Sequence, residues 1–499
     1  MIRKRKYEED FEMTLEALRK DMVAAMKAKE KGYDGAYLFD LSYPSMIAFM
    51  QYAERRDLRE KIYRAHNTRC VGGEFDNRDI VIRIAEIRNE IARLLGHKNY
   101  AEYVLEHRMA QNSDRVYNLL NQLLEAYKPT ALREIKQLQA FAEKKEGHPV
   151  ELMPWDYSYY STLQKDELYD LNDEMLKPYF ELEQVKKGVF GLATRLYGLT
   201  FKKNSEIPVY HPEVETFEVF DEDGSYLGVL YTDFYPRSTK QGGAWMTSFK
   251  DQWITREGEN SRPHISLVMN FTRPTESTPA LLTYDEVETF LHEFGHALHG
   301  LMANSRYESL SGTNVYRDFV ELPSQLMENW LPEQEFLETF AHHHLTGEVL
   351  PDSLIQKIRN TQRYHVGYHC VRQLTFGMLD MAWHTQTEKI EDITAFEQNA
   401  ISPTQLLPVI DGTLISSQFS HVFGGGYAAG YYGYKWAEVL DADAFSLFME
   451  NGIFDKKTAE AFRKNILEKG DTEEPMTLYV RFRGREPEIE AMMRRDGIK

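Results

Sequence analysis

Two histidines one helical turn apart are the residues of this chain best suited to hold a metal ion. In "TYDEVETFLHEFGHALHG", residues 283–300, His292 and His296 are four residues apart and so project from one helix face. That spacing lets two imidazoles reach one Zn²⁺ at about 2.0–2.1 Å each. Glu293, beside the first histidine, stands where a general base for a water molecule would be needed. The pattern predicts one zinc ion per chain at a hydrolytic site.

The elements around these residues fit such a site. Thr283 and Glu286 have the spacing of a capping box, so a helix is predicted over 284–302. "HISLVMNF", residues 264–271, is typical of a short strand. We expect the edge of this strand to lie just before the helix and to bind extended polypeptide backbone.

A third ligand must come from elsewhere, because a catalytic zinc keeps three protein ligands and one open position. The pattern HExxHxxGxxH would need a histidine where Met302 stands, so that pattern is excluded. His299 lies too far along the helix axis to join the same tetrahedron, and we interpret it as a residue that either supports the ligands from behind or serves the fold. A purely structural zinc site is disfavoured, since such sites usually have four Cys or His ligands.

The segment "YRDFVELPSQLMENW", residues 316–330, is the better source of a ligand. We predict a helix over 315–330 that lines one face with oxygen atoms from Asp318, Glu321, Gln325 and Glu328. Opposite two zinc-binding histidines, this face would supply a carboxylate. The spacing alone does not choose between Asp318, Glu321 and Glu328.

The composition of the 499 residues limits the possible partners. Hydrophobic residues make up 42% and charged residues 27%, and no apolar run reaches the 18 residues of a membrane span. The net charge of −19 opposes nucleic acid and anionic membranes as partners. The two cysteines match no disulfide scaffold, and the first residues lack the apolar core of a signal peptide. The expected location is the cytoplasm; the sequence does not determine the oligomeric state.

The chain is expected to be mostly α-helical with one small, antiparallel-rich β-sheet. Helical periodicity covers most of the first 200 residues, and "ETFEVF" and "SYLGVLYTDF" around "DEDG" predict a β-hairpin. We predict an N-terminal helical lobe over 1–150 and a catalytic region over 151–499, with the sheet at about 213–272. The predicted helices in the first part are 11–32, 79–95, 113–145 and 182–196.

With these motifs the sequence resembles the zinc peptidases that include thimet oligopeptidase, oligopeptidase A and bacterial dipeptidyl carboxypeptidase. "GGAWMTSF", "EVETFLHEFGHALHGL", "DFVELPSQLMENW" and "HVFGGGYAAGYYGYKWAEVL" carry the resemblance, which extends over nearly the whole chain. "YESLSGTNVYRDFVELPSQ" and "DFYPRSTKQGGAWM" are most similar to dipeptidyl carboxypeptidase. The resemblance implies a zincin-type catalytic core, with two helical lobes around a deep substrate channel.

The resemblance also implies roles for particular residues. Glu321, 29 residues after His292, corresponds to the family's third zinc ligand. In the Gly/Tyr loop, residues 420–436, His421, Tyr427 and Tyr434 correspond to residues that bind substrate and stabilise the oxyanion. Tyr434 is our first choice for the oxyanion donor, and the loop glycines would let the loop close over a peptide. Asp318 or Glu328 is expected to orient a ligand histidine.

The implied activity is hydrolysis of short peptides with release of C-terminal dipeptides. An endo-acting oligopeptidase of the same family is the alternative. An exopeptidase needs a cation for the substrate's terminal carboxylate, and Arg317, Arg372 and the arginines of "RFRGREP" are equal candidates.

The family's members are longer at the N-terminus, so this chain is expected to begin partway into their helical lobe. An export signal before these residues would be compatible with that expectation. The shortened N-terminus motivates an alternative of another class, a catalytically weak peptide-binding protein. The presence of Glu293, Tyr427 and Tyr434 favours the enzyme.

Overall fold

The computed structural model describes residues 2–3, 32, 36–37, 39, 41, 43–237 and 239–498. The helix predicted over 11–32 therefore lies almost entirely outside the described residues. The chain divides into two compact units, each built from separate stretches of sequence. The first comprises residues 1–104, 112–170 and 363–431, and the second comprises residues 105–111, 171–362 and 432–499.

The first unit is helical apart from one short strand pair, β1 (Ile2–Arg3) with β2 (Ala36–Tyr37). Its longest helix, α7, begins after Asn112, whose side chain accepts a hydrogen bond from the Arg115 N–H. It ends at Gly147, which takes the left-handed conformation typical of a helix C-terminus. The helices are α3 (Tyr43–Tyr52), α4 (Arg56–Asn67), α5 (Arg78–Leu94), α6 (Tyr100–Leu105, ending in the second unit), α7 (Ser113–Glu146), α8 (Tyr157–Tyr169), α15 (Val366–Thr385), α16 (Ile393–Ile401) and α17 (Ser420–Phe423), with short 3₁₀ turns at Ser402–Thr404 and Ser416–Gln418.

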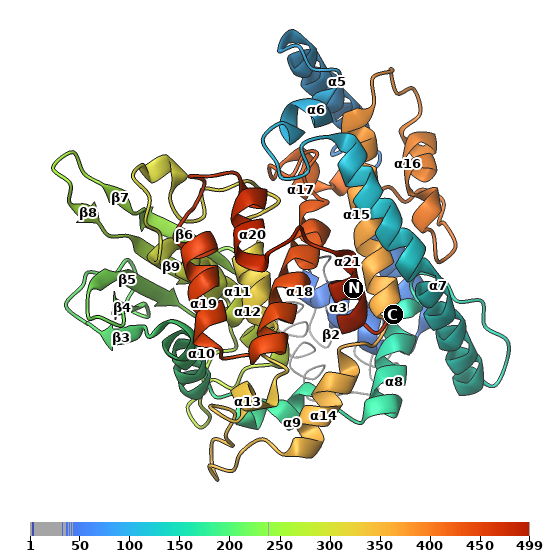
Figure 1. The fold of residues 1–499 in the computed structure, drawn as a ribbon. Helices are drawn as coiled ribbons and strands as arrows, with labels where there is room; N and C mark the ends of the chain where they lie inside the picture. The colour runs from blue at the N-terminus through green and yellow to red at the C-terminus, as the bar shows by residue number, and fades with distance from the viewer. Residues whose placement is uncertain are drawn as a thin grey trace. The chain divides into compact units, whose positions relative to one another are not determined.

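The second unit combines helices with a five-stranded sheet (Figure 1). The strands are β3 (Thr200–Lys203), β4 (Glu215–Phe220), β5 (Tyr226–Asp233), β6 (Trp245–Lys250) and β9 (His264–Val268), and β7 (Trp253–Ile254) pairs separately with β8 (Asn260–Ser261). The helices are α9 (Asp173–Leu176), α10 (Leu182–Tyr197), α11 (Tyr284–Leu301), α12 (Leu322–Glu328), α13 (Gln334–Leu337), α14 (Asp352–Thr361), α18 (Gly433–Asn451), α19 (Lys456–Phe462), α20 (Pro475–Arg483) and α21 (Ile489–Arg495), with 3₁₀ turns at Lys177–Tyr179 and Glu308–Leu310 and a π-helical turn at Arg463–Leu467.

The order of the strands corrects one expectation. The sheet runs β3-β4-β5-β9-β6, and the predicted hairpin is the antiparallel pair β4–β5 around the Asp221–Ser225 turn. Strand β9, the predicted "HISLVMNF" strand, pairs in parallel with β5 and antiparallel with β6. It is therefore an inner strand, and the edge beside it is β6. The expectation that β9 offers a free edge is wrong, because periodicity identifies a strand but not its neighbours.

Helix α11 forms as the sequence predicts. The Thr283 side chain accepts from the Glu286 N–H, and the Glu286 carboxylate accepts from the Thr283 N–H. The apolar side of the helix packs on the sheet, where Phe290 and Phe294 are fully buried with Leu267. Burying one such side chain contributes about 1.5–3 kcal/mol. The capping box and this core fix where the two histidines emerge.

The segment that was predicted as one helix over 315–330 is mostly not helical. Residues 317–321 form turns, and helix α12 begins only at Leu322, with Pro323 in its first turn. Proline is favoured at a helix start and disfavoured inside one, so the turn-to-helix boundary follows from Pro323. Asp318 and Glu321 therefore do not share a helix face with Glu328.

The fold agrees with the predicted class, which is mostly α with a small sheet in which three of four strand pairs are antiparallel. The helices found at α5, α7 and α10 confirm three of the predicted segments. The two units do not divide the chain at residue 150, because residues 363–431 of the predicted catalytic region belong to the first unit. The predicted functional division at residue 150 stays a prediction. The deep channel likewise stays a prediction.

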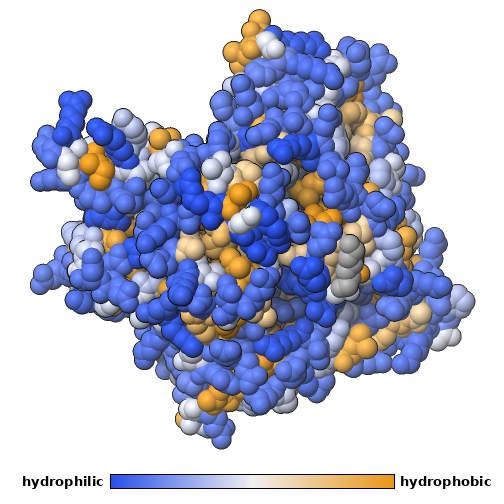
Figure 2. All heavy atoms as spheres, viewed as in Figure 1, coloured by the Kyte–Doolittle hydropathy of each residue, from blue (hydrophilic) through white to orange (hydrophobic). Residues whose placement is uncertain are grey.

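Most atoms on the face shown in Figure 2 belong to hydrophilic residues, and hydrophobic ones are scattered among them. Among the described residues, no helix is both long and apolar enough to cross a membrane.

Candidate metal centre

Three side chains from α11 and the start of α12 converge in the second unit. His292 Nε2 lies 3.3 Å and His296 Nε2 lies 3.2 Å from the same atom, Glu321 Oε2. One ligand atom from each of the three residues falls within 4.8 Å of the others. The two imidazole rings are 5.1 Å apart and nearly perpendicular. Of the alternatives that spacing left open, the structure brings Glu321 to the histidines.

This arrangement fits a tetrahedral divalent cation. Ligand atoms at about 2.0–2.1 Å from a tetrahedral zinc are separated from one another by about 3.3–3.4 Å. The two distances to Glu321 Oε2 are close to that separation. Two nitrogen donors and one carboxylate are also a donor set that zinc accepts at catalytic sites. The residues present therefore fit the metal.

Glu321 is held in place by its own helix start. Glu321 is the residue just before α12, and its backbone carbonyl accepts a hydrogen bond from the Gln325 N–H. Its side-chain Oε2 accepts a hydrogen bond from the Ser324 hydroxyl at 3.0 Å. The helix that carries the histidines comes unusually close here. A Cβ built on Gly295 would lie 2.4 Å from the Pro323 carbonyl oxygen and 2.6 Å from Ser324 Cα. Only glycine permits this approach, which brings Glu321 within reach of both histidines.

Glu328 orients the first histidine from behind. Its Oε1 accepts a hydrogen bond from His292 Nδ1 at 2.5 Å, which leaves Nε2 facing Glu321. A carboxylate on the far nitrogen fixes the tautomer and raises the basicity of a ligand histidine. Asp318, the other candidate for this role, has different partners: its carboxylate binds Met109, Ala110 and Tyr432.

The site is rich in negative charge. Burial opposes protonation of His292, but hydrogen bonds to Glu321 and Glu328 raise its pKa to about 10. Burial and the charge of Glu328 raise the pKa of Glu288, one turn earlier on α11, to about 8. Glu321 and Glu328 thus stabilise a positive charge on His292. A divalent cation would take the place of this charge, because imidazole binds metals in its neutral form.

Glu293 is buried beside the ligands. Burial raises the pKa of its carboxyl, and the neighbouring His292 and His296, followed by the backbone of Met246 in β6, partly oppose this rise. Its Oε2 is shielded from solvent and has no hydrogen-bond partner among the described residues. An unpaired buried carboxylate oxygen is costly, and such atoms are concentrated at functional sites.

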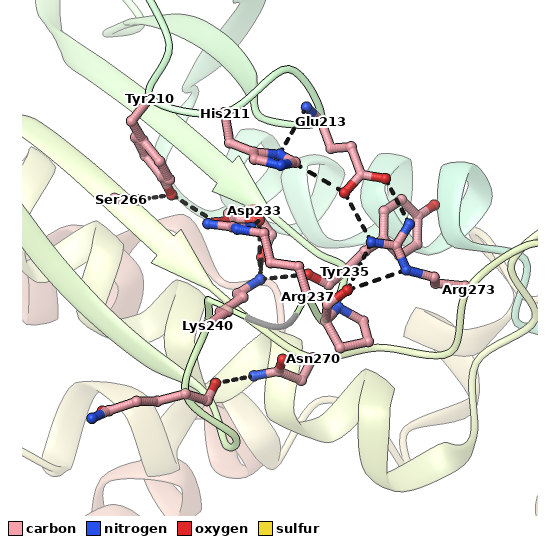
Figure 3. Close-up of polar contacts among 12 residues, drawn as sticks. Tyr210, His211, Glu213, Asp233, Tyr235, Arg237, Lys240, Ser266, Asn270 and Arg273 are labelled. Carbon is pink, nitrogen blue, oxygen red and sulfur yellow. Dashed lines mark hydrogen bonds and ion pairs between the residues drawn. The ribbon is translucent and has the colours of Figure 1, made fainter. Parts of the chain in front are cut away.

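The edge strand β6 begins at an anchored connection (Figure 3). Asp233, the buried last residue of β5, accepts two hydrogen bonds from Arg237 at 2.8 and 2.9 Å and one from Tyr210 at 3.0 Å. The buried Lys240 Nζ donates to the Asp233 carboxylate and to the carbonyl oxygens of Asp233 and Tyr235.

The far end of the same connection is held by Asn270, whose amide donates to the carbonyl oxygens of Gln241 and Gly243 at 2.8 and 2.7 Å. Both contacts are made a few residues before β6 begins. The connection thus fixes the entry to the strand whose Met246 contacts Glu293.

The Gly/Tyr loop contributes residues to both units. In the first unit, His421 is exposed, and its ring lies 5.9 Å from the ring of Tyr427. The end of the loop there is held by the buried Asp380, which accepts from the N–H groups of Ala429, Gly430 and Tyr431. Tyr434 belongs to the second unit, where it is half-buried in the first turn of α18.

Three contributors escaped the sequence reasoning. Ser324 contacts Glu321 through its hydroxyl and Met246 lies beside Glu293 through its backbone, and no spacing rule marks either residue. Gly295 did carry a signal, since a glycine inside a helix costs about 0.5–1 kcal/mol in stability and suggests a packing reason.

His299 is fully buried, and no described residue donates to or accepts from its ring.

A helix-borne histidine pair, a nearby glutamate ligand and a buried carboxylate define the metal site of a zinc-type hydrolase. The model of peptidase family M3 matches residues 49–498. The chain belongs to this family of metallopeptidases, for which a catalytic metal, generally zinc, is expected.

Named relatives agree with this assignment. Oligopeptidase A of Escherichia coli is 41% identical over 98% of this chain and 73% of its own length. Dipeptidyl carboxypeptidase of the same organism is 38% identical over 95% of this chain and 70% of its own length. Both activities occur among the relatives, so similarity alone does not choose between them.

Solved structures share the fold. The structure titled PZ peptidase A with inhibitor 2 has a TM-score of 0.52 at 15% identity, over 97% of this chain and 74% of that chain. Pyrococcus furiosus carboxypeptidase, titled Apo-Mg, has a TM-score of 0.51 at 12% identity, over 98% of this chain and 93% of that chain. At these identities the likeness concerns the fold alone.

The close approach at Gly295 predicts that Gly295→Ala weakens both folding and metal binding. The added methyl would overlap backbone atoms of α12, which cannot move as a side-chain tip can. We expect a loss of about 1–3 kcal/mol in the free energy of unfolding and a weaker zinc affinity. Chemical denaturation and zinc competition with a chelator measure the two effects.

The matched control is Gly191→Ala on α10, where a Cβ meets nothing within 4 Å. This change should leave zinc affinity unaltered and stabilise the helix by up to about 1 kcal/mol. Equal behaviour of the two variants would contradict the role of Gly295.

The Glu328–His292 contact predicts that Glu328→Gln lowers zinc affinity by about 10–100-fold, because His292 loses a charged acceptor. A competition titration measures the affinity, and Glu335→Gln, a change at an exposed carboxylate of α13, serves as control. Unchanged affinity in Glu328→Gln would show that the contact does not support the ligand.

Proposed function

We propose that this chain hydrolyses short peptides at a zinc ion bound by His292, His296 and Glu321. The observation that carries the proposal is the convergence of both imidazole Nε2 atoms on Glu321 Oε2, at 3.3 and 3.2 Å, beside the buried Glu293. Membership in a metallopeptidase family supports the reaction class. When bound, zinc polarises the scissile carbonyl and lowers the pKa of a water molecule to about 7.

Glu293 is the proposed general base. It accepts the proton of the attacking water at its otherwise unpartnered Oε2 and then donates a proton to the leaving amine. Burial raises the pKa of Glu293 above that of an ordinary glutamate, which brings it closer to the working pH of a base that must also act as an acid.

The Tyr434 hydroxyl is the proposed donor to the negative charge that develops on the carbonyl oxygen. One such donor typically contributes about 10²–10³ in rate. His421 and Tyr427 are proposed to contact the substrate. These three roles rest on the family resemblance of the loop.

For the finer activity we propose release of C-terminal dipeptides, which the "DFYPRSTKQGGAWM" and "YESLSGTNVYRDFVELPSQ" motifs support. Internal cleavage is the second candidate, favoured by the 41% identity to oligopeptidase A. Among the candidate cations for the terminal carboxylate, Arg481 pairs with Glu473, while Arg483 and Arg485 pair with the buried Asp443. Arg372 lies over the Phe376 ring and Arg317 also has a partner, so these contacts favour none of the five arginines.

Glu293→Gln tests the proposed function directly. The amide cannot accept the water proton, so we expect turnover to fall by at least about 10²-fold while one zinc per chain is retained. Cleavage of an internally quenched peptide and metal analysis of the same sample provide the two readouts. Glu276→Gln, at an exposed site, should match the unmodified protein. Near-normal turnover in Glu293→Gln would remove Glu293 from the role of base.

The mode of cleavage is tested with one decapeptide in two forms, with a free and with an amidated C-terminus. Because an exopeptidase must bind the terminal carboxylate, we expect stepwise loss of two residues from the free form and little cleavage of the amide. Mass spectrometry of the digest records the products. Internal cuts at equal rates in both forms would contradict dipeptide release and support the endo-acting alternative.

A further inference from the structure

We propose that Asp318 is a positioning residue that fixes Tyr434 relative to the zinc ligand Glu321. The inference rests on the proposed role of Tyr434 as the oxyanion donor. Asp318 precedes Glu321 by three residues, in the turns that lead into α12. Its side chain reaches the residue before α18, the helix whose first turn contains Tyr434.

The contacts of Asp318 join three segments of the second unit. Oδ2 accepts from the Tyr432 hydroxyl at 2.7 Å and from the Ala110 N–H at 3.1 Å, while Oδ1 accepts from the Met109 N–H at 3.0 Å. Hydrogen bonds to a charged acceptor are the stronger ones, with values of about 1.5–3 kcal/mol each.

The backbones of the two segments also lie close together. A Cβ built on Gly433 would lie 3.5 Å from Asp318 Cα and 3.8 Å from the Arg317 carbonyl oxygen. Tyr432 is itself fully buried, and its carbonyl accepts from the Trp436 N–H at 2.9 Å in the first turn of α18. Asp318 therefore fixes both the position and the start of this helix.

Burial explains why this contact is rigid. Asp318 is 2% exposed and Tyr432 is 1% exposed, so water cannot replace either partner without opening the core. Burial also raises the pKa of Asp318, and its hydrogen bonds oppose that rise. Helix α12 packs against both α11 and α18 (Figure 1), so the ligand helix, the Glu321 segment and the Tyr434 helix form one packed group.

The role differs from simple support of the fold. Catalysis is sensitive to misplacement of a donor by about 1 Å, which can cost about 10²-fold in rate. A contact that only stabilises the fold would lower the melting temperature without such a loss. Tyr479 of α20 offers a comparison, since its hydroxyl donates to the buried Asp443 of α18 at 2.8 Å and to the Leu440 carbonyl oxygen at 3.1 Å.

The experiment compares Tyr432→Phe with Tyr479→Phe in the full chain with zinc bound. Each change removes one tyrosine hydroxyl from a buried aspartate, and Tyr479→Phe also removes a hydrogen bond to Leu440, so Tyr479→Phe should lower the melting temperature at least as much as Tyr432→Phe. Only Tyr432→Phe should lower kcat, by about tenfold or more, with little change in KM or zinc content. Equal kcat in the two variants would overturn the proposal. Asp318→Asn, which keeps one acceptor oxygen, should also lower kcat.

A double-mutant cycle identifies the residue being positioned. If Asp318 acts through Tyr434, then adding Tyr432→Phe to Tyr434→Phe should cause no further loss of kcat. Additive losses would contradict the proposal. If Tyr434→Phe alone leaves kcat unchanged, the proposed catalytic role of Tyr434 fails. Hydrogen exchange then still tests the contact: Tyr432→Phe, but not Tyr479→Phe, should speed exchange at residues 433–437, and unchanged exchange would overturn the positioning role.

Discussion

The rest of the structure depends on the contact between one carboxylate oxygen, Glu321 Oε2, and two imidazole nitrogens on a neighbouring helix. Both Nε2 atoms lie within 3.3 Å of this oxygen, which is close enough for one cation to be shared by all three groups. These groups can act as ligands, because imidazole and carboxylate both bind metals in their deprotonated forms. The fold therefore brings the three ligand residues together in one place.

Bringing these groups together requires close contacts that a general hydrophobic core would not require. Helix α11 approaches the backbone of α12 at Gly295, and Ser324 holds the Glu321 carboxylate from its own helix. Glu328 supports His292 from the other side. Each of these residues lies on a helix or at a helix start, where packing limits motion. The packed core of the second unit therefore holds the ligands in place.

The sequence was sufficient for the parts that follow local rules. The capping box at Thr283, the four-residue histidine spacing and the hairpin were all predictable, because each depends on residues close in sequence. The neighbours of β9 and the true start of α12 were not, since strand order and a proline-limited helix start depend on tertiary packing. Choosing Glu321 over Asp318 and Glu328 required either the resemblance or the fold. Spacing does not show where the turns place Asp318 and Glu321, or which way α12 directs Glu328.

The central claim is that one metal ion is bound by two imidazoles and a single carboxylate, with one position left for water. X-ray absorption spectroscopy of the zinc-loaded protein tests it most directly. The account predicts a shell of nitrogen and oxygen donors at about 2.0–2.1 Å, including two imidazoles, with no sulfur. In Glu321→Ala the protein oxygen should be lost from this shell. A four-imidazole or sulfur-containing shell, or a spectrum unchanged by Glu321→Ala, would contradict the account.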